Sequence, residues 1–97
     1  MRDAGVSVSS MFVLELSFAP DDAERLAARP THRERLAALK ADGVVVLAGP
    51  FADDSGALVV LDVPDRAAAE AVVAEDPYYS LGGVEVANLR HWRPLPL

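Results

Sequence analysis

The sequence contains no cysteine, a single lysine (Lys40) and few aromatic residues, which make up 6% of its 97 positions. The absence of cysteine excludes disulfides, thiolate catalysis and cysteine-based zinc sites, and it fits a reducing compartment. Basic residues are outnumbered nine to fifteen by acidic ones, which gives a net charge of −6. Binding to nucleic acid needs clustered Lys and Arg side chains, so this composition argues against a nucleic-acid partner.

Long hydrophobic runs are also absent. No apolar stretch approaches the roughly 20 residues that span a bilayer, and residues 1–10 lack the apolar segment of a signal peptide. We therefore expect no membrane partner, a cytoplasmic location and a disordered N-terminal extension over residues 1–9. Hydrophobic residues still make up 52% of the chain, enough for one domain over residues 10–97 with an aliphatic core.

Four segments carry the patterns of β-strands. Between residues 10 and 19, large apolar side chains recur at every second position, the period of a strand: Phe12, Leu14, Leu16 and Phe18. Residues 44–49 and 57–63 are short apolar runs rich in β-branched side chains, which predicts strands buried on both faces. Residues 84–92 form the fourth predicted strand.

The main helix is predicted over residues 31–41. Thr31 and Glu34 have the spacing of a capping box, in which each side chain satisfies a backbone N–H of the other residue. A short helical turn over residues 23–26 precedes it and is closed by Pro30, and Gly43 is a plausible left-handed residue after the helix end.

A second, alanine-rich helix is predicted over residues 66–75. It follows Pro64-Asp65 and ends at Asp76-Pro77, because the residue before a proline disfavours the helical region. Residues 78–83 then form a loop or a single turn.

The predicted order β-α-β-β-α-β indicates an α+β ferredoxin-like sandwich, a four-stranded antiparallel sheet with two helices on one face. The second and third strands are apolar on both faces, but the two helices cover only one face of the sheet, so the other apolar face is left uncovered. An open apolar sheet is a larger hydrophobic patch than soluble monomers usually expose. We therefore predict a homodimer in which two sheets pack face to face as a dimeric α/β barrel.

Connectivity alone predicts where a site would form. In this topology, the start of the first helix, the end of the second strand and the segment after the second helix meet at one edge of the sheet. That edge collects His32, Gly49-Pro50, the turn at residues 53–56 and residues 76–83.

An ordered set of features resembles the YCII-related (YciI-like) family. These features are Arg29 followed by His32, Gly43 and then Gly49-Pro50, the turn ending in Gly56, Asp76-Pro77-Tyr78, and a closing Arg90-His91-Trp92. The resemblance implies a ferredoxin-like fold, a dimeric α+β barrel and a His–Asp active-site pair that falls on His32 and Asp76. It also implies a relation to a dehydrochlorinase of chlorinated aromatics, and the barrel fold includes lactone isomerases and small monooxygenases.

His32 is the candidate acid–base catalyst, because an imidazole exchanges protons near neutral pH; the alternative is an exposed histidine in the first helical turn. Asp76 either orients the His32 ring, as the carboxylate does in hydrolase triads, or only caps a short turn. If the two are adjacent, we expect the carboxylate to outweigh the helix dipole and to keep His32 protonated or poised near neutrality.

Six further residues are candidates for substrate binding. Arg29 would bind an anionic group, Gly49 and Pro50 would let a ligand approach the backbone, and Tyr78 and Tyr79 would line a pocket. Each also has a purely structural explanation, as an exposed arginine, a turn or half-buried packing.

The sixth candidate, Glu15, is predicted to point into the barrel, where its buried carboxylate would need a partner such as Arg90. His91 and Trp92 are interpreted as strand ending and core packing.

These residues favour a small-molecule enzyme that uses acid–base chemistry, as a lyase or isomerase, with no cofactor and a small organic acid or aromatic compound as ligand. No histidine or carboxylate spacing typical of a metal site occurs, and no phosphate-binding or dinucleotide glycine pattern. The alternatives are a non-catalytic ligand-binding or dimerisation module and, less favoured, a cofactor-independent monooxygenase.

Overall fold

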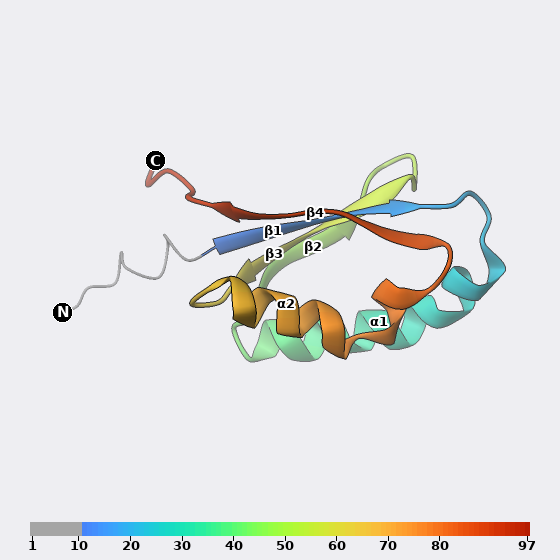
Figure 1. The fold of residues 1–97 in the computed structure, drawn as a ribbon, viewed down its shortest axis with the longest axis horizontal. Helices are drawn as coiled ribbons and strands as arrows, with labels where there is room; N and C mark the ends of the chain where they lie inside the picture. Colours follow the sequence, from blue (N-terminus) through green and yellow to red (C-terminus); the bar gives the residue numbers. More distant parts are fainter. Residues whose placement is uncertain (1–10) are drawn as a thin grey trace.

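The computed structural model describes residues 11–97. The elements follow the order β1 (Met11–Phe18), α1 (Ala23–Ala41), β2 (Val45–Pro50), β3 (Gly56–Asp62), α2 (Arg66–Glu75), the 3₁₀ helix η2 (Pro77–Ser80) and β4 (Val84–Trp92). The strands pair antiparallel in the order β2-β3-β1-β4. Both helices lie on the same side of the sheet (Figure 1), which confirms the predicted α+β ferredoxin-like fold. The N-terminal extension predicted at residues 1–9 lies outside the described residues.

The core lies between the sheet and the helices. On the central strand β1, Phe12, Leu14 and Leu16 are buried, while the residues between them are not. Val59 and Leu61 of β3 are buried beside them, so the period of two identified the inward face correctly. None of the described helices is long and apolar enough to cross a membrane.

Helix α1 differs from the prediction. It begins at Ala23, where Asp22 caps it by accepting a hydrogen bond from the backbone N–H of Arg25 at 2.8 Å, and it continues through Pro30. The capping box at Thr31 and the break at Pro30 are therefore wrong. A proline inside a helix costs about 3 kcal/mol. A single long helix buries Arg25 and His32 on its two halves, and we attribute its continuity to this packing.

The end of α1 was predicted correctly. Gly43 has a positive φ of 80°, and its N–H donates to the carbonyl of Lys40 while the N–H of Val44 donates to that of Leu39. This pair of bonds is a Schellman motif, which needs a left-handed residue at the position of Gly43. The chain consequently turns at once into β2.

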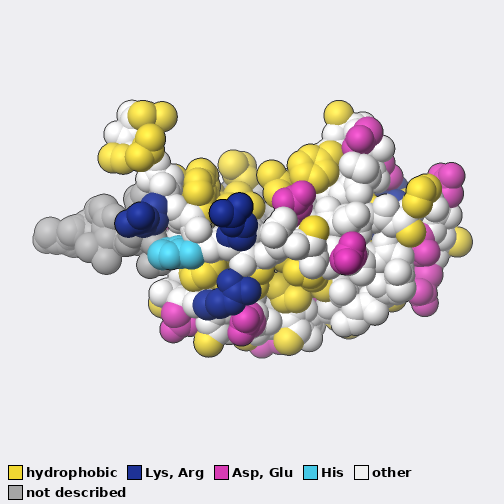
Figure 2. Space-filling model, turned by 45° about the horizontal axis from the view of Figure 1, so that its top comes forward, with side chains coloured by type: hydrophobic (Ala, Val, Ile, Leu, Met, Phe, Trp, Pro, Cys, Tyr) yellow, Lys and Arg dark blue, Asp and Glu magenta, His cyan; other side chains and the backbone are white. Residues whose placement is uncertain are grey.

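The outer face of the sheet, opposite the helices, is open in the single chain. The second strand, predicted as buried on both faces, has only Val45 buried. Leu47 is 67% exposed, and Trp92, predicted as core, is 45% exposed. Figure 2 shows hydrophobic side chains spread over this face, with basic side chains near the chain termini and acidic ones both beside them and toward the other end. His91, in contrast, stacks on Phe12 at 4.9 Å between ring centroids.

A β-bulge in β4 changes the neighbour of Glu15. The register between β1 and β4 shifts between Glu15 and Leu16. Alternate residues of β4 therefore point to one face of the sheet before the bulge and to the other face after it. Glu15 consequently pairs with Asn88, whose Nδ2 donates to Glu15 Oε1 at 3.2 Å. Arg90, the predicted partner, lies opposite Val13 instead.

Candidate functional site

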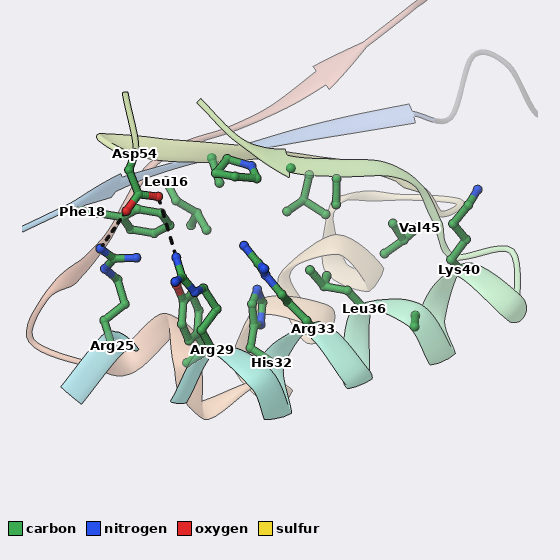
Figure 3. Close-up of a pocket in the computed structure, with 17 residues that line it drawn as sticks. Leu16, Phe18, Arg25, Arg29, His32, Arg33, Leu36, Lys40, Val45 and Asp54 are labelled. Carbon is green, nitrogen blue, oxygen red and sulfur yellow. Dashed lines mark ion pairs between the residues drawn. The ribbon is translucent and has the colours of Figure 1, made fainter. Parts of the chain in front are cut away.

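A cavity of about 430 Å³ lies between α1 and strands β1, β2 and β3 (Figure 3). Its volume falls within the range of about 300–1,000 Å³ that is typical of small-molecule sites. Apolar side chains form its walls, and charged ones come mainly from α1: Arg25, Arg29, Arg33 and Lys40. The cavity extends from the sheet edge that connectivity predicted along α1 to Lys40. Five of the predicted site residues line it: Arg29, His32, Gly49, Pro50 and Tyr78.

His32 and Asp76, 44 residues apart, are in direct contact. His32 Nδ1 lies 2.7 Å from Asp76 Oδ2, and the two residues are only 8% and 4% exposed. An ionised carboxylate only accepts hydrogen bonds, so the proton of a neutral His32 resides on Nδ1. The lone pair of the ring is then on Nε2, which makes no hydrogen bond among residues 11–97. The predicted contact is confirmed.

The structure places Asp76 by local chain geometry. Asp76 caps the 3₁₀ helix η2, with Pro77 at its first position, and its Oδ1 accepts a hydrogen bond from the N–H of Tyr78 at 3.0 Å. One carboxylate oxygen thus orients the turn and the other orients the imidazole. Capping and orientation were alternatives in the sequence, and Asp76 does both.

Two tyrosines fix the plane of the imidazole. The Tyr78 ring stacks on His32 with centroids 3.9 Å apart and planes inclined by 6°, and Tyr79 packs edge-on at 5.2 Å. Both tyrosines are buried, and burial raises the pKa of Tyr79 well above its usual range, so its hydroxyl stays protonated. Tyr78 lines the cavity, whereas Tyr79 supports the ring from outside it.

Burial dominates the protonation of His32. It lowers the pKa of the imidazole below its ordinary value of 6.5; the hydrogen bond and charge of Asp76 act in the opposite direction, and Arg33 and Arg35 lower the pKa further. The expectation that the carboxylate would prevail is therefore wrong, because burial outweighs it. Of the two expected outcomes, a protonated ring or one poised near neutrality, the lowered pKa contradicts the first. His32 also lies in the middle of α1 rather than in its first turn, so the dipole argument does not apply. The neutral base is the resting form.

This shift predicts a pH-dependent stability. Because the pKa of His32 is lower in the folded protein, the unfolded chain takes up the proton more readily. The contribution of neutral His32 to the free energy of unfolding is complete above pH 6.5, and it is lost as the pH falls toward the pKa of the folded protein. We expect the free energy of unfolding to decrease as the pH falls below 6.5, until the pH reaches the lowered pKa of folded His32. Urea denaturation across this range measures it.

The two histidines provide the control. His32→Gln should flatten this pH dependence, whereas His91→Gln, at an exposed position outside the cavity, should retain it. A steep dependence that survives in His32→Gln would contradict the assignment.

Two predicted binding residues do not line the cavity: Tyr79, which packs against His32 from outside it, and Glu15, which the structure keeps away from it. Glu15 lies on the outer face of the sheet, bonded to Asn88, while the cavity is on the helix side. The predicted direction of Glu15, away from the helices, is therefore correct. The prediction that it shares one binding site with the other candidates is wrong.

Sequence reasoning missed Arg25 and Arg33, and it placed the turn at residues 53–56 at this edge without giving Asp54 a role. Arg25, Arg29 and Arg33 follow one another at intervals of four residues, the spacing of one helix face. That signal was hidden because a break at Pro30 assigned Arg25 to a separate turn. Asp54, in the turn before β3, lies within ion-pair distance of Arg25 and Arg29. Within residues 11–97, no three histidine or carboxylate side chains gather as metal ligands would.

Comparison with known proteins gives the family and the fold of the chain. Residues 11–93 match the YCII-related domain. A comparison with curated proteins found no significant match. A solved structure, the 5-chloro-2-hydroxyhydroquinone dehydrochlorinase (TftG) from Burkholderia phenoliruptrix AC1100 in complex with 2,5-dihydroxybenzoquinone, superposes with a TM-score of 0.70. It is 20% identical and covers 84% of this chain and 92% of its own, a similarity that shows a shared fold.

Proposed function

The chain belongs to the YCII-related family, and we propose that it is a small-molecule enzyme that works by acid–base chemistry, as a lyase or an isomerase. The observation that carries the proposal is the buried His32–Asp76 pair at the wall of a cavity of ligand size. Buried polar pairs that serve only stability are common away from cavities; here the unbonded Nε2 belongs to a residue that lines one. That combination is typical of a general base.

In the proposed reaction, Nε2 of neutral His32 takes a proton from the substrate. Asp76, bonded to Nδ1, then stabilises the imidazolium and keeps the ring in place, as in hydrolase triads. In a lyase, the electron pair of the broken bond expels a leaving group from the neighbouring atom. In an isomerase, the proton returns to a different atom. In the lyase route the imidazolium then gives its proton to the leaving group or to water, and in the isomerase route the returned proton restores the base. Both routes therefore regenerate neutral His32.

A dehydrochlorinase among similar structures supports the lyase route, although at this identity the substrate of that enzyme does not carry over. The first experiment measures chloride release from 5-chloro-2-hydroxyhydroquinone by the wild-type protein. Alongside it, small keto acids are incubated in D₂O and followed by NMR for exchange of carbon-bound protons. Enzyme-dependent chloride release or exchange is expected. The absence of both, with ligands bound in the cavity, would overturn the proposal.

The second candidate is a non-catalytic ligand-binding module. It is favoured by one observation, the tight stacking of His32 under Tyr78, which would equally serve a rigid binding wall. This candidate predicts that ligands bind without proton exchange. The deuterium experiment therefore separates the two.

We also propose that the protein is a homodimer in which the outer faces of two sheets pack together. The exposed Leu47, Leu58 and Trp92 on that face support it, because soluble monomers rarely expose such patches.

Light scattering at micromolar concentration should give twice the mass of the chain. Leu47→Asp would bury a carboxylate in the proposed interface without a partner, so we expect it to shift the protein to monomer. Leu95→Asp is the matched control, because Leu95 is 73% exposed in the C-terminal tail, and it should remain dimeric. A monomeric wild type would rule out the interface.

A further inference from the structure

The cavity concentrates positive charge in an acidic protein. The chain has a net charge of −6 and nine basic residues, yet four of them line the cavity and only one carboxylate, Asp54, does. Figure 3 shows Arg25, Arg29 and Arg33 rising from α1 toward the strands on either side of His32. Low-dielectric walls strengthen the attraction of such a cluster for an anion.

Arg25 is the least explained of these cations. It is 2% exposed, with its guanidinium stacked 4.2 Å over the Phe18 ring. Its Nε and Nη1 are buried with no hydrogen-bond partner. Buried polar groups are nearly always hydrogen-bonded, and a charged donor without an acceptor is costly. The free protein therefore leaves two donors of a cavity-lining guanidinium unsatisfied.

The single carboxylate in the cavity lies between two arginines. Asp54 Oδ2 is 3.5 Å from Arg25 Nη2, and Oδ1 is 3.9 Å from Arg29 Nη1. Charge-assisted hydrogen bonds to a carboxylate are normally about 2.7–2.9 Å long, so both contacts are loose. Asp54 also lies half-exposed in a turn, with a φ of 61°. Two guanidiniums one helical turn apart thus hold an internal carboxylate poorly.

We propose that the substrate is a small carboxylic acid whose carboxylate binds Arg25 and Arg29 in the place that Asp54 occupies in the free protein. Its body packs on the apolar walls formed by Leu16, Leu36 and Val59. His32 lies three residues after Arg29, roughly 4.5 Å along the helix axis, so the reacting carbon lies a few bonds from the carboxylate. This inference rests on the proposed function for its reaction, but not for its binding.

Benzoate and benzamide test it as a pair, since they differ in charge but not in shape. Isothermal titration of the wild-type protein should detect benzoate and not benzamide at the same concentration, and inorganic phosphate should bind more weakly than benzoate. Equal binding of benzoate and benzamide would overturn the carboxylate site. Tighter binding of phosphate would assign the site to a different class of anion and overturn the proposal as well.

Variants locate the carboxylate. Arg29→Gln should weaken benzoate binding by roughly tenfold or more, the loss expected for one charge-assisted hydrogen bond. Arg25→Gln should do the same where it folds; Arg29 is partly exposed and keeps the test available if it does not. Arg66→Gln, outside the cavity in an ion pair with Glu70, is the control and should bind normally. Unchanged affinity in folded Arg29→Gln would contradict the proposal.

Asp54→Asn tests the displacement. It removes the competing carboxylate and should tighten benzoate binding several-fold. Asp53→Asn removes the same charge one residue away, where the side chain binds only Ser55, and should have a smaller effect. Weaker binding in Asp54→Asn would mean that Asp54 orients the arginines and is not displaced, which overturns this part.

The proposal and the proposed function fail in different ways. His32→Gln should abolish proton transfer while benzoate is still preferred over benzamide. Preference for benzoate in a protein with no turnover would refute the enzyme and keep the carboxylate site. Turnover of an uncharged substrate, with benzoate and benzamide bound equally, would refute the carboxylate site and keep the enzyme.

Discussion

His32→Gln is expected to lower kcat by roughly 10²–10⁴-fold, the contribution typical of a positioned general base. The imidazole lines the cavity, and its Nδ1 is bonded to Asp76. This hydrogen bond fixes the lone pair on the opposite nitrogen, Nε2. Glutamine has no basic atom, yet its amide N–H can still donate to the Asp76 carboxylate. The variant therefore removes the base and leaves the buried carboxylate with a partner.

This result is interpretable only with intact folding. Circular dichroism and the melting temperature of His32→Gln should remain close to those of the wild type, because the bond to Asp76 persists. His91→Gln, which changes the other histidine of the chain, should retain full turnover. Wild-type turnover in a folded His32→Gln protein would exclude His32 as the base.

Much of the fold was predictable because short-range patterns determine it. The alternation in residues 10–19 identified Phe12, Leu14 and Leu16 as the inward face of β1, and Gly43 marked the end of α1. Once the order of elements was fixed, antiparallel topology brought His32 and Asp76 to one sheet edge. Connectivity plus the resemblance therefore predicted that the two residues share an edge, whereas the 2.7 Å contact itself is a finding of the structure.

The failed predictions are those that depend on tertiary contacts. Pro30 predicts a break from local chemistry, and only the burial of Arg25 and His32 on one continuous helix reverses it. The bulge that pairs Glu15 with Asn88 has no signal in the sequence. Each feature had a consequence: the first concealed the row of arginines, and the second places Asn88 instead of Ala87 opposite Glu15.

The protonation of His32 was mispredicted for the same reason. The carboxylate was considered by its charge, but the desolvation of the ring depends on how Tyr78 and Tyr79 enclose it. Burial proves to be the largest effect on the pKa. A base that rests neutral beside a carboxylate is suited to accept a proton, because Asp76 stabilises the imidazolium only after the transfer.

Asp76→Asn is expected to reduce kcat about as much, roughly 10²–10⁴-fold, through a change of tautomer. Asparagine caps helices as well as aspartate does, so its amide oxygen can keep the bond to the N–H of Tyr78. Its NH₂ group then faces His32 Nδ1, where two donors would meet. The ring avoids this by moving its proton to Nε2, which leaves no lone pair toward the substrate. An equivalent carboxylate-to-amide change in hydrolase triads acts in this way.

The tautomer is measurable without any substrate, from the ¹⁵N chemical shifts of the His32 ring. The wild type should show a protonated Nδ1, and Asp76→Asn a protonated Nε2. Asp65→Asn is the matched control, because Asp65 caps α2 through Ala68 and does not contact His32; it should leave both the tautomer and kcat unchanged. If Asp76→Asn inverted the tautomer without loss of turnover, Nε2 could not be the atom that takes the proton. The pair would then be structural, and a different group would have to take the proton.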